Sequence, residues 1–125
     1  MKLLKATLFI GALFFVTQSY GQHLPPSYQP MFNEIIVNFE TITTGNSINE
    51  GKNSLRVINE DRIVLRVEHK RKVKNLTFET KLDEENKKIW MASNDLTIDM
   101  VNKYEDYLTK TLESLHKLSE KKSKE

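Results

Sequence analysis

The sequence predicts a mixed α+β domain, preceded by a signal peptide. In this domain a four-stranded antiparallel meander packs against an N-terminal helix and a long C-terminal helix, in the order α-β-β-β-β-α. Three observations lead to this prediction. Apolar and polar residues alternate over 62–68 and 76–82, apolar residues recur at helical spacing over 101–118, and an uncharged apolar run occupies 6–16. The chain contains no cysteine, so the fold has to be stable without disulfide bonds.

The first 21 residues have the pattern of an export signal. Lys2 and Lys5 precede the apolar run 6–16, which is too short to span a bilayer, and Gly21 precedes the expected cleavage before Gln22. We therefore expect a secreted or periplasmic protein with no membrane span after cleavage. Because small exported eukaryotic domains commonly carry disulfides, the lack of cysteine favours a bacterial source.

Removal of this leader changes the charge balance of the chain. The sequence has 19 Lys and Arg and 17 Asp and Glu, and the loss of Lys2 and Lys5 leaves 17 residues of each sign. The remaining domain is then close to neutral, which argues against nucleic acid as a partner. Any function that depends on positive charge therefore has to come from a local cluster of basic residues.

Residues 22–30 are expected to form an extended, proline-rich segment, because Pro25, Pro26 and Pro30 disfavour a helix and remove backbone donors. Over 31–43 the sequence is compatible with a helix or with a strand. Apolar residues recur there at helical spacing, whereas several β-branched residues favour a strand. We expect the helix, because strict alternation of apolar and polar residues fails.

The middle of the chain carries the strand signals. Residues 45–54 are rich in Gly and Asn and are expected to form a loop. Four strands joined by short polar turns are then expected at 55–58, 62–68, 76–82 and 88–92. The alternation predicts that one face of their sheet is buried and the other is wet.

Asn94 or Asp95 is expected to cap one long helix that runs to about Lys121. This helix ends a single domain of residues 31–121 and leaves 122–125 as a disordered tail. The stripe on the helix consists of Val101, Tyr104, Leu108, Leu112, Leu115 and Leu118. It either packs on the sheet or serves as the seam of a homodimer, although the heptad pattern is too short to predict a coiled coil.

The densest cluster of charge is Lys70, Arg71, Lys72 and Lys74, which falls at an expected hairpin tip. Four cations so close together could bind an anionic partner such as an acidic protein surface, a phosphate or an acidic glycan. The alternative interpretation is a solubilising hairpin end that also blunts edge-to-edge strand pairing.

Few other side chains point to chemistry. Trp90 is a candidate aromatic contact for a sugar, because the alternation is taken to place it on the less buried side of the sheet. His23, His69 and His116 have no ligand or triad partner at a recognisable spacing. We therefore predict no catalytic residue, no cofactor and no metal ligand.

These observations favour a small exported, non-enzymatic binding module that engages an unidentified protein or an anionic partner. One alternative is a self-associating structural or envelope protein that uses the C-terminal helix. A second alternative is a small-ligand carrier or a hydrolase with a pocket between helix and sheet.

Overall fold

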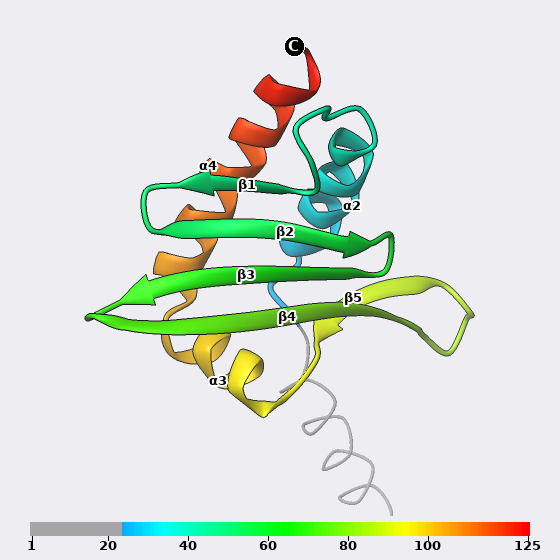
Figure 1. Cartoon of the computed structure of the whole chain (residues 1–125). Helices are drawn as coiled ribbons and strands as arrows, with labels where there is room; N and C mark the ends of the chain where they lie inside the picture. The colour runs from blue at the N-terminus through cyan, green and yellow to red at the C-terminus, as the bar shows by residue number, and fades with distance from the viewer. Residues whose placement is uncertain (1–23) are drawn as a thin grey trace, which may run out of the picture.

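The computed structural model describes residues 24–125, so the expected leader lies outside the described part of the chain. The described part has an α+β fold, as predicted (Figure 1). In chain order its elements are α2 (Tyr28–Phe39), β1 (Ser47–Glu50), β2 (Asn53–Asn59), β3 (Arg62–His69), β4 (Lys72–Leu82), β5 (Lys88–Ala92), α3 (Asp95–Lys103) and α4 (Glu105–Ser123).

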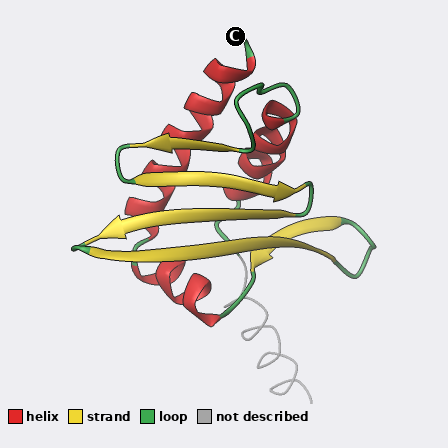
Figure 2. Ribbon diagram, viewed as in Figure 1, coloured by secondary structure: helices red, strands yellow, loops and turns green. Residues whose placement is uncertain are grey.

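The strands form one antiparallel sheet in the order β1-β2-β3-β4-β5, so each strand pairs with its neighbours in sequence. Helices α2 and α4 cover the same face of this sheet, and α3 lies at its β4 edge (Figures 1 and 2). Ile63, Leu65 and Val67 of β3 are fully buried beneath the helices. Arg62 and Arg66 alternate with them and point to the open face, as the sequence pattern predicts.

The prediction of four strands was wrong, because β1 forms inside the segment expected to be a loop. Ser47–Glu50 pairs with the start of β2 through a tight turn that holds Gly51 at a φ of +61°. Ile48 is buried and lies opposite Leu55. One inward-facing residue is too short a pattern to reveal a strand, and the surrounding Asn and Gly residues gave the signal of a loop.

The prediction of one long C-terminal helix was also wrong, because the chain breaks at Tyr104. This residue has φ −126° and ψ 38° and separates α3 from α4. Thr97 fixes the direction of α3, since its buried hydroxyl accepts a hydrogen bond from the backbone N–H of Thr77 at 3.1 Å. Helix α4 instead packs along α2, so α3 and α4 have to run in different directions. Asn94 caps α3 as expected, with its side chain accepting a bond from Thr97 N at 2.9 Å.

Both ends of the domain are more ordered than the sequence predicts. The helix preferred for 31–43 is confirmed, but it begins at Tyr28 and ends at Phe39. Tyr28 is fully buried and its hydroxyl hydrogen-bonds with Thr109 Oγ1 at 3.1 Å, so part of the segment expected to be extended belongs to the core. At the other end, α4 continues to Ser123, where a disordered tail was expected.

An aromatic cluster joins α2 to the sheet. Phe32 packs against Phe78 and Trp90 with ring centroids 4.9 and 5.2 Å apart. The Trp90 indole N–H donates to Asn33 Oδ1 at 2.9 Å, and the Gln29 side-chain amide bonds both the backbone N–H and the carbonyl of Trp90. Strand β5 is therefore fastened to α2 by side-chain bonds.

Candidate functional site

The basic cluster occupies the tip of the β3–β4 hairpin, as expected, and this tip projects beyond the ends of β1 and β2 (Figure 1). Lys70 and Arg71 form a two-residue turn between the paired residues His69 and Lys72. Both turn residues have positive φ, at 52° and 66°. Such turns favour Asn-Gly, because a left-handed backbone costs an ordinary residue about 1 kcal/mol or more.

The four cations of the tip have no carboxylate within ion-pair distance among residues 24–125. Lys70, Arg71 and Lys72 are exposed, and Lys74 is half-buried. Several other basic residues of the hairpins, by contrast, are neutralised locally. The ion pairs that do so are Lys52–Glu68, Arg62–Glu79, Lys87–Glu85 and Lys88–Asp61.

Aromatic residues at the break between α3 and α4 support the base of the tip. The His69 ring lies between Tyr104 and Tyr107, with centroids 4.6 and 4.8 Å away. The Tyr107 hydroxyl donates to the backbone carbonyl of Glu68 at 3.1 Å, which holds β3 against α4. Lys103 lies over the Tyr104 ring at 5.6 Å and adds a further cation on this side. The sequence gave no signal for this support, because it joins residues about 35 positions apart.

The two halves of strand β4 have different neighbours, and the first half, which leads from the tip to Thr77, lies at an edge of the sheet. Its pairing with β5 begins at Phe78, so residues 72–76 have β3 on one side and no strand of the described chain on the other. Helix α3 packs against β4 at the far end of this edge, where Thr77 bonds Thr97, so the backbone groups nearer the tip are the ones open to an additional extended segment. The tip and this edge are continuous.

The other predicted contact residue, Trp90, lies in the core and not on a surface. Its side chain is 2% exposed, so it offers no face for stacking with a sugar. The alternation correctly placed Trp90 opposite Ile89 and Met91, but the face assigned as less buried is the face beneath the helices. The stripe of α4 is also internal, since Leu108, Leu112 and Leu115 are fully buried.

A groove of about 580 Å³ lies at the opposite end of β4 from the basic tip. Its lining combines apolar side chains with the acidic β4–β5 loop and consists of Leu24, Pro26, Gln29, Asp83, Glu84, Glu85, Ile89 and Trp90. It is the kind of pocket between helix and sheet that the carrier hypothesis requires.

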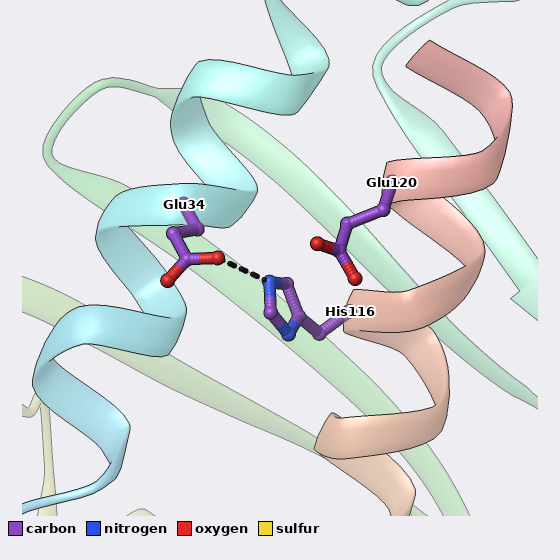
Figure 3. A group of neighbouring side chains, drawn as sticks. All are labelled: Glu34, His116 and Glu120. Atoms are coloured by element: carbon purple, nitrogen blue, oxygen red, sulfur yellow. Dashed lines mark hydrogen bonds and ion pairs between the residues drawn. The ribbon is translucent and has the colours of Figure 1, made fainter. Parts of the chain in front are cut away.

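A third cluster joins the two long helices, where no site was predicted. Glu34 of α2 faces His116 and Glu120 of α4 (Figure 3), and one potential ligand atom from each lies within 4.8 Å of the others. The His116 Nε2 atom is 3.1 Å from Glu34 Oε1. His116 thus has a partner that no spacing in the sequence indicated, whereas His23 lies outside the described residues.

Part of this cluster was visible in the sequence. His116 and Glu120 are four residues apart, and this spacing places them on one face of a helix. Glu34 is 82 residues from His116, so only the packing of α2 on α4 reveals it.

Comparisons with protein-family models, with curated proteins and with solved structures found no match. No family is assigned. Within residues 24–125, no helix has the length and apolar character needed to cross a membrane.

Proposed function

We propose that this chain is an exported, non-enzymatic binding module that contacts an acidic protein surface through the basic tip of the β3–β4 hairpin. The observation that carries this proposal is the combination of four cations that have no ion-pair partner among residues 24–125 with a strained turn made of two of them. Unfavourable backbone conformations persist where the surrounding structure enforces them, and they concentrate at functional sites.

The strain argues against a purely solubilising role for the tip. An Asn-Gly turn flanked by Lys72 and Lys74 would close the same hairpin at lower conformational cost and would still carry two charges. Placing Lys70 and Arg71 in the turn gains only additional positive charge at the most projecting point. That charge has a use if an anionic surface meets the tip.

The free edge of β4 favours a protein as the partner. An extended acidic segment that adds to residues 72–76 would gain backbone hydrogen bonds from the edge and charge contacts from the tip. Alternation places the side chain of Val73, which is 46% exposed, on the opposite face of β4 from Lys72 and Lys74, so an apolar contact is offered on the open face of the sheet.

The test is binding to poly-L-glutamate, used as a defined acidic polypeptide. The purified protein should bind it, and binding should weaken steeply as NaCl rises from about 0.05 M to about 0.5 M, where the Debye length is below about 5 Å. Changing Lys70, Arg71, Lys72 and Lys74 to Glu should reduce the affinity at least about tenfold.

A matched control reverses three exposed lysines of α4 and the one that directly follows it, which also lack a carboxylate within ion-pair distance in the described structure: Lys110, Lys117, Lys121 and Lys124. This variant has the same net charge as the tip variant and should retain clearly more binding. Equal loss in both variants would mean that bulk charge, and not the tip, drives the association. Charge of either sign at the strand edge disfavours edge-to-edge aggregation, so the glutamates of the tip variant keep this protection. A loss of binding in this variant therefore reports on the partner contact and not on aggregation.

Export is proposed from the leader sequence alone. Mass spectrometry of the protein isolated from the medium or the cell envelope should find Gln22 as the first residue. A product that retains Met1 would contradict the proposal.

The groove between α2 and the β4–β5 loop favours a second candidate function, the carriage of a small cationic amphiphile. Trp90 lines this groove and is the single tryptophan of the chain, so its fluorescence reports on occupancy. Octylammonium should change the emission, and a Glu84→Gln, Glu85→Gln variant should reduce the response. An unchanged emission spectrum would eliminate this candidate.

A further inference from the structure

We propose that Glu34, His116 and Glu120 form a binding site for a divalent transition-metal ion, with Zn²⁺ as the best match, and that this ion links α2 to α4. This inference is independent of the basic tip. It rests on the ligand chemistry of the three side chains, on their distances and on the packing that holds their backbones in place.

The three side chains offer one imidazole nitrogen and two carboxylates (Figure 3). Neutral imidazole and carboxylate together suit zinc and related transition metals, whereas Mg²⁺ and Ca²⁺ prefer ligand sets made only of oxygen. Three protein ligands leave a fourth tetrahedral position for water. The composition therefore selects the chemical class of the ion.

The distances allow a metal ion after a small adjustment of side chains. Ligands about 2.1 Å from a tetrahedral zinc ion are about 3.4 Å from one another. The His116 Nε2–Glu34 Oε1 distance is 3.1 Å, and all three ligand atoms lie within 4.8 Å. The Glu34 side chain is 57% exposed, so its carboxylate has room to adjust its position relative to His116 and Glu120.

The backbones that carry the ligands are fixed on both sides of the site. Asn38 Nδ2 donates to the Ser119 hydroxyl at 2.9 Å, about one turn further along each helix. In the other direction, Tyr28 and Thr109 join the same two helices through their hydroxyls. Since neither helix has to shift, a metal ion would be bound with little loss of conformational entropy.

The negative charge of the Glu34 and Glu120 carboxylates also favours the binding of a cation. Neither Glu34 nor Glu120 has a lysine or arginine within ion-pair distance among residues 24–125. Two carboxylates around one imidazole can be balanced by a metal ion or by protonation of His116. These two possibilities differ at the Nε2 atom, which carries either the metal or a proton.

The test is calorimetric titration of the full chain with ZnCl₂, in the presence and absence of excess MgCl₂. One Zn²⁺ should bind per chain, and Mg²⁺ should not compete. Substituting His116→Gln or Glu120→Gln should weaken Zn²⁺ binding at least about 100-fold, since loss of a direct ligand exceeds the effect of losing an outer-shell partner. Glu105→Gln, an exposed residue at the start of α4 and about three turns before His116, is the matched control and should bind as the wild type does.

Nitrogen NMR of the imidazole rings provides a second readout that does not depend on the variants. Addition of Zn²⁺ should remove the Nε2 proton of His116 and shift its resonance, and the folded state of each variant is checked by circular dichroism. Absence of Zn²⁺ binding, equal binding by the His116→Gln and control variants, or a His116 Nε2 that keeps its proton in Zn²⁺ would overturn the proposal.

Discussion

Strand β4 connects two turns of opposite charge, and their construction differs as much as their sign (Figure 1). The basic tip at one end has four positive side chains, whereas the loop at the other end begins with Asp83, Glu84 and Glu85. In the acidic loop, Asp83 Oδ1 accepts hydrogen bonds from the backbone N–H groups of Glu85 and Lys87, each at 2.8 Å. The charge of Asp83 thus stabilises its own turn.

The two turns also differ in the residue types that occupy their left-handed backbone positions. In the acidic loop this position is filled by Asn86, with φ 64°, and asparagine tolerates it well. In the basic tip it is filled by Lys70 and Arg71, which do not. The residues of the acidic loop therefore stabilise their own turn, whereas the basic tip retains charge and strain that do not stabilise the fold.

The largest expected effect comes from replacing the strained turn with a favourable one. The double substitution Lys70→Asn, Arg71→Gly should raise the free energy of unfolding by about 2 kcal/mol, because it relieves two left-handed residues. The same variant should bind poly-L-glutamate more weakly, since it loses two of four charges. Urea denaturation measures the first effect. A variant with the same free energy of unfolding as the wild type would show that Lys70 and Arg71 do not destabilise the turn.

A smaller effect of opposite sign is expected in the acidic loop. Asp83→Ala should lower the free energy of unfolding by about 1 kcal/mol, because two backbone N–H groups lose their acceptor. Glu84→Ala is the control, since Glu84 makes no side-chain hydrogen bond or ion pair within the described chain. If both variants unfold at the same urea concentration, the Asp83 bonds do not stabilise the loop.

The smallest expected effect is a pH dependence at the same end of the sheet. The Lys88 side chain and then the Thr80 hydroxyl hydrogen-bond Asp61 and lower its pKa from the usual 3.8. A carboxyl with a lower pKa in the folded state contributes stability above its unfolded pKa and loses it as the pH falls through the folded value. The urea midpoint of the wild type should therefore exceed that of Asp61→Asn at pH 7, and the difference should shrink as the pH falls below 3.8.

The same pair has an opposite dependence at high pH. Asp61 raises the pKa of Lys88 above 10.5, so the contribution of Lys88 is complete below that pH and is lost as the pH rises through the folded value. Because both groups are exposed, salt should reduce the difference at either extreme. A midpoint difference that does not shrink as the pH falls below 3.8 would contradict the role of this ion pair.

Local pattern was sufficient for the elements that depend on near neighbours. The alternation in β3 and β4 predicted their hairpin, most of its buried side chains and the position of the basic tip, because each follows from the period of a strand. The same pattern places Leu82 inward, yet this residue at the end of β4 is 64% exposed. The cap of α3 at Asn94 was predicted for the same reason.

Features that depend on distant residues could not be predicted in this way. Which side of β5 faces the helices is decided by Asn33 and Phe32, so the correct alternation still misplaced Trp90. The break at Tyr104 follows from the different partners of α3 and α4, and periodicity within one helix carries no information about them. The cluster of Glu34 with His116 exists only because α2 packs on α4.

The most direct test of the account is amide NMR mapping of the protein during titration with poly-L-glutamate. Chemical-shift changes should concentrate at residues 69–76, in the tip and along the free edge of β4, and NaCl should reverse them. Changes centred on the acidic loop at 83–87, or spread evenly over the lysines of α4, would contradict the claim that the basic tip is the contact site.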